Sequence, residues 1–378
     1  MSVETHLGVG AIGELPGILE KQRAKTILII SGQCSYNLSG AADYMEPILA
    51  LYQTVRFSSL ADYPDLPDIE RGVTLCRKAN PDVIIAVGGG TVIDIAKLLR
   101  ICSVNDATPD EIATGTGTIE RAGPPLVAIP TTAGSGSEAT HFAVIFKQQQ
   151  KYSVAHQFVQ PDFAIVDPSL TYSMSERQTA VCGLDVLCQS IESIWSVGSS
   201  RESRTWASEA AHLVLLNLVG TVRTPNEARR ESMSRAAHLA GRAINISKTT
   251  APHALSYMLT TSYGIPHGHA VALTLGSFLE FNAEVSEEDL NDPRGVHHVR
   301  EMIGDVCSLL GAHNPLNGRR ALVDLMGSIG METRLGPCGI ERAADCARIV
   351  ETVNVERLSN NPRSTTKAQL TQLLEKLI

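Results

Sequence analysis

The sequence lacks the features that mark several large classes of protein. Its 378 residues contain no run of about 18 apolar residues, so we expect no membrane-spanning segment and no membrane partner. The first residues include neither the basic nor the apolar stretch of a secretion signal. The eight cysteines are scattered without a Cys-x-x-Cys pair, which is typical of reduced thiols. We therefore predict a cytoplasmic protein without disulfides.

Basic charge is also in short supply. Lysine and arginine total 32 against 40 aspartate and glutamate, a net charge of −8, which argues against a nucleic-acid partner. A few local basic residues can still bind a small anion. The content of hydrophobic residues, 43%, and of charged residues, 19%, is that of a globular protein, and 378 residues exceed one ordinary core. Two domains are the expectation.

The first 170 residues alternate apolar strand-like runs with helix-like segments. Strands are predicted at residues 25–31, 82–87, 125–129 and 163–166, and helices, for example, at 67–79 and 91–102. This rhythm predicts a doubly wound α/β, Rossmann-like domain over residues 1–170.

Strand-like runs become scarce beyond Pro168, which follows the last predicted strand. Segments with helical periodicity take their place, at residues 175–197, 203–222, 226–246, 268–281, 294–310, 318–329 and 367–377. We predict an all-α domain over residues 171–378.

A glycine-rich turn follows the strand at 82–87 and opens a helix. Gly88, Gly89, Gly90 and Thr91 let the backbone approach a pyrophosphate at a helix N-terminus, and Asp94 follows one turn later. The spacing is not G-x-G-x-x-G, so the ordinary Rossmann fingerprint does not apply. A plain tight turn is the alternative.

A second turn, at residues 129–138, also follows a predicted strand. It offers backbone amides and the hydroxyls of Thr131, Thr132 and Ser135. Two such turns at the carboxyl ends of strands favour a nucleotide crevice over two structural turns. Gly32 and Lys151 are further candidates for cofactor binding. No carboxylate follows the strand at 25–31, which favours NADPH over NADH.

A possible metal site lies in the second half of the chain. Asp185 and Gln189 are four residues apart and share one face of a predicted helix. His253, at the end of a short segment, and His267, at a turn, follow. A carboxylate, an amide oxygen and two imidazoles can hold a divalent metal that acts as a Lewis acid on a substrate oxygen. Each histidine could equally be a hydrogen-bonded core or surface residue.

Four motifs together resemble the iron-containing (group III) alcohol dehydrogenases over essentially the full chain. They are residues 88–97, residues 129–138, Gly183-Leu-Asp185-Val-Leu-Cys-Gln189 and Pro266-His267-Gly268. The resemblance implies the dehydroquinate synthase-like fold, a homodimer, NADH or NADPH, and Fe²⁺ or Zn²⁺ bound by an aspartate and three histidines. Asp185, His253 and His267 match three of these ligands, and Gln189 replaces the fourth.

The resemblance also implies a proton relay. Where the family often has a further histidine one turn after His253, this chain has Tyr257. We predict that Tyr257 or His269 relays the proton.

Residues 242–257, 265–273 and 360–363 resemble the phosphonoacetaldehyde reductases of phosphonate natural-product biosynthesis. This implies reduction of a small anionic aldehyde, phosphonoacetaldehyde, to 2-hydroxyethylphosphonate. Arg242 and Lys248 could bind the phosphonate, or they could be a solvated helix face or a helix C-terminal cap.

The alternatives are a group III dehydrogenase for another anionic or small aldehyde or alcohol, and a dehydroquinate synthase-like lyase or glycerol-1-phosphate dehydrogenase. A metal-free binding protein on the same fold is a third, because Gln189 weakens the predicted site.

Overall fold

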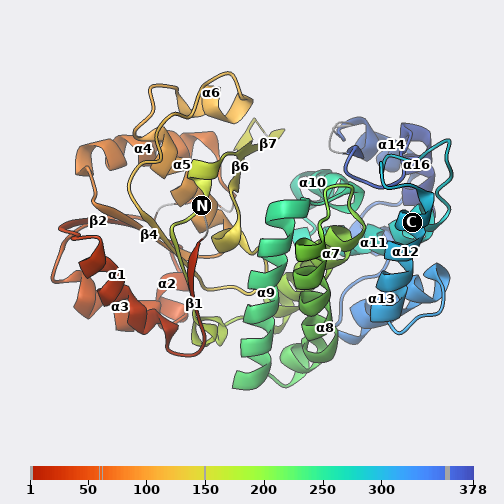
Figure 1. Cartoon of the computed structure of the whole chain (residues 1–378), viewed down its shortest axis with the longest axis horizontal. Coiled ribbons are helices and arrows are strands. Elements are labelled where there is room, and N and C mark those ends of the chain that lie inside the picture. The colour runs from red at the N-terminus through yellow and green to blue at the C-terminus, as the bar shows by residue number, and fades with distance from the viewer. Residues whose placement is uncertain (1–2, 59, 62, 149, 354–357) are drawn as a thin grey trace. The chain divides into compact units, whose positions relative to one another are not determined.

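The computed structural model describes residues 3–58, 60–61, 63–148, 150–353 and 358–378. The chain forms two compact units (Figure 1). The first comprises Met1–Met174 and Asn226–Gly241, and the second comprises Ser175–Pro225 and Arg242–Ile378. Most of helix α9 (Glu227–Ser247) therefore packs with the first unit, which the sequence-based division at residue 170 did not include.

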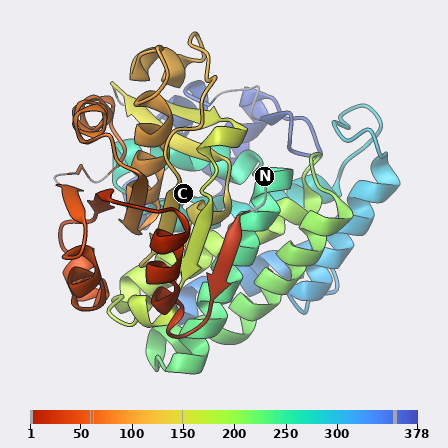
Figure 2. The same cartoon turned by 60° about the vertical axis from the view of Figure 1, so that its left-hand side comes forward.

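A six-stranded parallel sheet forms the centre of the first unit, in the order β1-β8-β5-β4-β2-β3 (Figure 2). The strands are β1 (Glu4–Leu7), β2 (Thr26–Ser31), β3 (Gln53–Phe57), β4 (Val83–Gly88), β5 (Leu126–Pro130) and β8 (Phe163–Val166). The four predicted strands are confirmed. The two that were not predicted, β1 and β3, lie at the edges of the sheet and carry polar residues, so they lack the apolar run of a central strand.

Helices cover both faces of this sheet. Alternate residues of the central strands point to opposite sides, so Leu28 and Ile30 join one apolar cluster while Ile27 and Ile29 join another. The first cluster contains α4 (Leu66–Ala79) and α5 (Gly90–Cys102), and the second contains α1 (Leu15–Lys21) and α3 (Ala41–Leu49). The predicted doubly wound α/β architecture is confirmed.

A separate hairpin of β6 (Phe142–Lys147) and β7 (Gln150–Ala155) was not predicted. Its turn contains Gln148 in a left-handed conformation, with φ of 49°, where hairpins usually place glycine or asparagine. The usual turn signal is therefore missing. The short helices α2 (Ser35–Leu38) and α6 (Pro109–Thr114) complete this unit.

The second unit is helical, as predicted. Its helices are α7 (Glu176–Trp195), α8 (Arg201–Arg223), α10 (Ala251–Tyr263), α11 (His267–Ala283), α12 (Val296–Leu309), α13 (Pro315–Ser328), α14 (Ala343–Glu351) and α16 (Lys367–Glu375). None of the helices described is long and apolar enough to cross a bilayer.

The prediction that His253 ends a short segment is wrong, because it lies in the first turn of α10. Pro252 occupies that same first turn, where a missing N–H does not disturb the helix.

Candidate active site

Three predicted metal ligands come together within the second unit. One ligand atom each from Asp185, His253 and His267 lies within 4.8 Å of the others. Asp185 lies in the middle of α7, His253 in the first turn of α10, and His267 is the first residue of α11. Asp185 is 7% exposed and His253 5% exposed, so the cluster is largely shielded from water.

Gly268 explains why His267 reaches this position. A methyl group at residue 268 would lie 2.1 Å from the Val181 carbonyl oxygen and 2.8 Å from Cβ of Asp185. The start of α11 therefore touches the backbone of α7 beside Asp185, an approach that only glycine permits. This contact gives the Pro266-His267-Gly268 motif a physical meaning.

Gln189 lies one turn after Asp185 on α7, is buried, and donates a side-chain hydrogen bond to the Asp185 carboxylate. It is therefore beside the cluster, where the family pattern places a histidine. Ligation by its amide oxygen stays a prediction.

The surroundings of the cluster favour positive charge. Burial opposes protonation of His253, but the charges and hydrogen bonds of Glu192 and Asp185 outweigh it and raise the pKa of His253 to about 10. Burial likewise opposes ionisation of Asp185, yet the neighbouring imidazoles of His253 and His267 keep its pKa below the ordinary value.

The donor set fits a divalent metal. Asp185 Oδ1 is buried and, among the described residues, makes no hydrogen bond within normal geometry; its distance to His253 Nε2 is 3.5 Å. A buried carboxylate oxygen in this state is satisfied by a cation. One carboxylate and two imidazoles are ligands that Zn²⁺ and Fe²⁺ accept.

Glu192 is a residue that the sequence analysis missed. It is 0% exposed, and its Oε1 forms a short hydrogen bond with Nδ1 of His253. A signal existed: Glu192 follows Asp185 by seven residues, which is two helical turns along the same face of the predicted helix.

The two candidates for the proton relay differ in their surroundings. The ring of Tyr257 stacks on that of His267, with centroids 6.2 Å apart and planes 10° apart. The ring of His269 instead shares a 2.7 Å hydrogen bond with the carbonyl of Glu332, and burial lowers the pKa of His269. The structure brings Tyr257 to the cluster and ties His269 to the backbone.

The two glycine turns lie side by side within the first unit. The Thr131 N–H donates to the Gly88 carbonyl, and a methyl group at residue 90 would lie 2.8 Å from the Ser135 hydroxyl oxygen. Gly89 caps α5, and a methyl group there would be 3.5 Å from the Thr132 hydroxyl. The two turns are thus packed closely together where the strands end, and Gly89 and Gly90 there lack a side chain that would keep a pyrophosphate away.

Asp94 and Lys97 hold the second turn in place. The Asp94 carboxylate accepts hydrogen bonds from the Ser137 hydroxyl, at 2.6 Å, and the Val144 N–H, at 2.9 Å. Lys97, which was not predicted as a site residue, is fully buried and donates to Ser137 Oγ, Thr140 Oγ1 and the Phe142 carbonyl. Burial lowers the pKa of Lys97 to about 8. The direct contact of Asp94 with a cofactor stays a prediction.

The remaining predicted cofactor residues are spread along this unit. Thr91 is in the first turn of α5, and Lys151 is on β7. Gly32 follows β2 and donates its N–H to the Val87 carbonyl at 3.3 Å. A methyl group at residue 32 would lie 2.2 Å from the Ser35 hydroxyl oxygen, so a larger residue there would require the Ser35 side chain to rotate.

Known proteins combine glycine turns and a metal-binding cluster of this kind in one family. The model of the iron-containing alcohol dehydrogenase family matches residues 2–168, and the model of its C-terminal domain matches residues 179–378. The chain belongs to the iron-containing alcohol dehydrogenase family. Membership confirms the predicted enzyme class, an NAD(P)-dependent alcohol dehydrogenase or aldehyde reductase with a divalent metal.

Two curated relatives of this dehydrogenase carry different names. A phosphonoacetaldehyde reductase of Streptomyces viridochromogenes is 35% identical over 330 residues, covering 83% of this chain and 80% of the relative. Long-chain-alcohol dehydrogenase 1 of Geobacillus thermodenitrificans is 33% identical, covering 72% and 70%. Similarity at this level shows the family and leaves the substrate to be argued.

A solved structure is similar over the whole dehydrogenase. The sulfoacetaldehyde reductase of Bifidobacterium kashiwanohense, in complex with NAD⁺, has a TM-score of 0.86 and 29% identity and covers 100% of this chain and 97% of its own. The predicted fold class is confirmed.

The two basic residues assigned to substrate lie in different settings. The Arg242 guanidinium stacks on the ring of Trp206, 3.9 Å from its centroid. Lys248 is exposed and directly follows α9 in a left-handed conformation, with φ of 57°. The stack supports the structural alternative for Arg242 and leaves Lys248 accessible.

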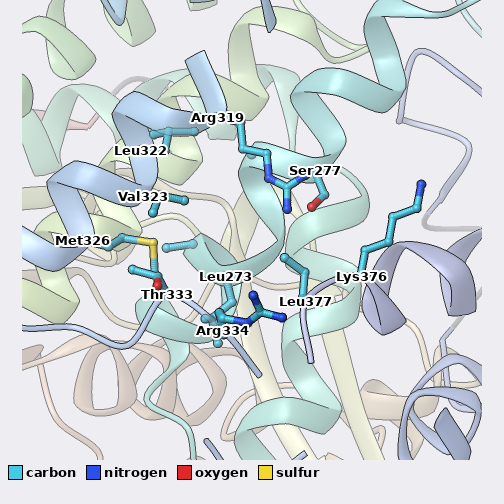
Figure 3. A pocket seen from close by; sticks show the side chains of 12 residues that line it. Leu273, Ser277, Arg319, Leu322, Val323, Met326, Thr333, Arg334, Lys376 and Leu377 are labelled. Atoms are coloured by element: carbon cyan, nitrogen blue, oxygen red, sulfur yellow. The ribbon is translucent and has the colours of Figure 1, made fainter. Parts of the chain in front are cut away.

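The dehydrogenase has another pocket in its second unit, of about 200 Å³, between α11, α13 and residues 376–377 (Figure 3). Leu273, Leu322 and Met326 contribute apolar surface, and Arg319 and Arg334 contribute charge. None of the predicted site residues lines it.

Proposed function

We propose that this dehydrogenase reduces phosphonoacetaldehyde to 2-hydroxyethylphosphonate with NADH or NADPH, as a step of phosphonate natural-product biosynthesis. The observation that carries the proposal is the 35% identity to a phosphonoacetaldehyde reductase. The similarity to a sulfoacetaldehyde reductase supports it, because both named substrates are short aldehydes that end in a strong acid.

We propose that Asp185, Gln189, His253 and His267 hold the metal, which supplies Lewis-acid polarisation of a carbonyl when bound. The amides of Gly88–Gly90 and of the turn at 131–135 would hold the pyrophosphate of the nucleotide. The Tyr257 hydroxyl would supply the proton, because its ring already stacks on His267. The balance is one hydride and one proton added to the aldehyde, giving the alcohol and the oxidised nucleotide.

A phosphonate carries close to two negative charges and requires a basic partner. Lys248 is the stronger candidate, since it is exposed and lies in the link between α9 and the first turn of α10, five residues before His253. Arg242 stays the second candidate.

The test compares NADPH and NADH oxidation with phosphonoacetaldehyde and with propanal. We expect a much higher kcat/KM for phosphonoacetaldehyde, and Lys248→Gln should remove most of this preference by raising KM. Lys78→Gln, at the exposed end of α4, serves as the control and should leave the preference intact. Equal kcat/KM for both aldehydes would exclude the phosphonate assignment.

A second candidate function is the oxidation or reduction of another small or apolar alcohol or aldehyde, favoured by the identity to a long-chain-alcohol dehydrogenase. A panel of alkanals and alkanols of increasing length separates the two, because a phosphonate enzyme should not gain activity with chain length.

Loss of the metal would leave a binding protein, as Gln189 could imply. Metal analysis of the purified protein, with chelation and add-back, decides this case. The homodimer stays a prediction from the family resemblance, and the cytoplasmic location stays a prediction from the first residues and the scattered cysteines.

A further inference from the structure

We propose that Glu192 is the positioning residue of the metal site: its buried carboxylate fixes the ring of His253 so that Nε2 faces the metal. This inference rests on the proposed function to the extent that a metal is bound. It assigns a role to a residue that is not among the four expected ligands.

Both oxygens of Glu192 are engaged. Oε1 bonds to His253 Nδ1, while Oε2 accepts the Thr250 N–H at 2.6 Å and the Thr250 hydroxyl at 2.8 Å. The Thr250 hydroxyl oxygen in turn accepts the indole N–H of Trp195 at 3.0 Å. A fully buried carboxylate is rare and is retained only with such a complete set of partners.

The bond from Glu192 selects one form of the His253 ring. A carboxylate accepts a hydrogen bond from Nδ1–H, so the lone pair of the neutral ring is on Nε2. Nε2 is the atom that points to Asp185 Oδ1, 3.5 Å away. A carboxylate on the far side of a ligating imidazole also strengthens it as a donor to a metal.

The segment that carries Thr250 is itself fixed. The hydroxyls of Ser193 and Ser247 lie 2.6 Å apart, and the Asn360 side-chain amide donates to the carbonyls of Ser247 and Thr249. The end of α7 and residue 360 therefore hold the link between α9 and α10. The ring of His253 is set by a rigid frame rather than by a single contact.

Glu192 should matter more here than beside a three-histidine site. A neutral amide is a weaker ligand than imidazole for these metals, so Gln189 contributes less to binding. More of the affinity then depends on His253 and on the carboxylate that strengthens it. We expect the effect of Glu192→Gln on metal affinity to shrink in a Gln189→His background.

The experiment measures Co²⁺ affinity by competition with a chelator, and the visible spectrum of bound Co²⁺, for the full-length protein. Glu192→Gln should weaken binding by about 10- to 100-fold and alter the spectrum. Glu176→Gln, an exposed residue in the first turn of the same helix, is the matched control and should match wild type in both. The NADPH affinity should be unchanged in both variants.

If wild type binds Co²⁺ and folded Glu192→Gln binds it equally well, the positioning role is wrong while the proposed function stands. If wild type binds no divalent metal, the proposed metal-dependent function fails as well. Should Glu192→Gln not fold, Thr250→Val decides: it removes one partner of Glu192 and should weaken Co²⁺ binding several-fold, and unchanged binding would overturn the proposal.

Discussion

The glycine turns of the first unit and the carboxylate–imidazole cluster of the second are made from different parts of the polypeptide. The turns present backbone amides at the ends of neighbouring parallel strands, and Gly88 and Pro130 are partners in one register. The cluster consists of side chains from three helices, with Asp185 and His267 82 residues apart. A site made of backbone amides depends on how closely the ligand can approach the backbone. A site made of side chains depends on how neighbouring polar groups orient each metal ligand.

This comparison predicts that the two sites fail separately. Substitutions that move the turns should weaken nucleotide binding and leave the metal in place. Substitutions that move α11 or its neighbours should release the metal and leave the nucleotide site intact.

The largest effect is expected for Gly268→Ala. The added methyl group would meet the backbone of α7, which cannot move aside, so we expect loss of metal, loss of activity and destabilisation by about 1–3 kcal/mol. Metal content and the free energy of unfolding measure this. Gly304→Ala, a helical glycine with open space around it, is the control and should retain both. Full metal content in Gly268→Ala would contradict the close approach.

The next largest effect is expected in the pH dependence of the free energy of unfolding, to which Lys97 contributes. Burial lowers the folded-state pKa of Lys97 from 10.5 to about 8. Between these values the unfolded chain holds more protons, so this residue makes the free energy of unfolding rise with pH, and below pH 8 its burial penalty is present in full.

Relative to Lys97→Met, the free energy of unfolding of wild type should therefore rise by roughly 2–3 kcal/mol from pH 7.5 to pH 10.5. Chemical denaturation across this range measures the difference. A constant difference would mean that Lys97 keeps an ordinary pKa.

Gly241→Ala tests the second turn without a substitution in the turn itself. A methyl group there would lie 2.4 Å from the Gly136 carbonyl oxygen and 2.8 Å from the Gly136 Cα, both backbone atoms of the second turn. We expect the Kd for NADPH to rise about tenfold, equal to about 1.4 kcal/mol, with unchanged metal content. Fluorescence titration and metal analysis check this. Loss of metal with unchanged NADPH affinity would contradict the prediction that the two sites fail separately.

Arg242→Gln should have the smallest effect. Removing its stack on Trp206 should lower the free energy of unfolding by about 0.5–1 kcal/mol, with KM for phosphonoacetaldehyde unchanged. Thermal unfolding and steady-state kinetics on the same preparation test both statements. A raised KM for phosphonoacetaldehyde would indicate that Arg242 binds the substrate.

The sequence predicted the central strands because they are buried on both faces and therefore form continuous apolar runs. It predicted most helices because each is buried on one face and therefore has apolar residues at helical spacing. It did not predict β1 and β3, because edge strands need few apolar residues. It did not predict α10, because His253 was interpreted as the end of a short segment. The metal residues Asp185, His253 and His267 were found through motifs. Glu192 and Lys97 were missed because the sequence alone does not show that a charged residue is buried, although helical spacing places Glu192 on the face of Asp185.

What the sequence determined by itself is therefore the order of strands and helices, the glycines at strand ends, and the residue types able to bind a metal. These features depend on the periodicity of apolar residues and on the conformational freedom of the backbone, and both are set by residues close together in the chain. Only the tertiary structure decided that Gly268 lets α11 touch α7, that Glu192 and Thr250 orient His253, and that Lys97 holds the second turn. Each of these depends on a distance between residues far apart in the chain, and burial gives such contacts their strength.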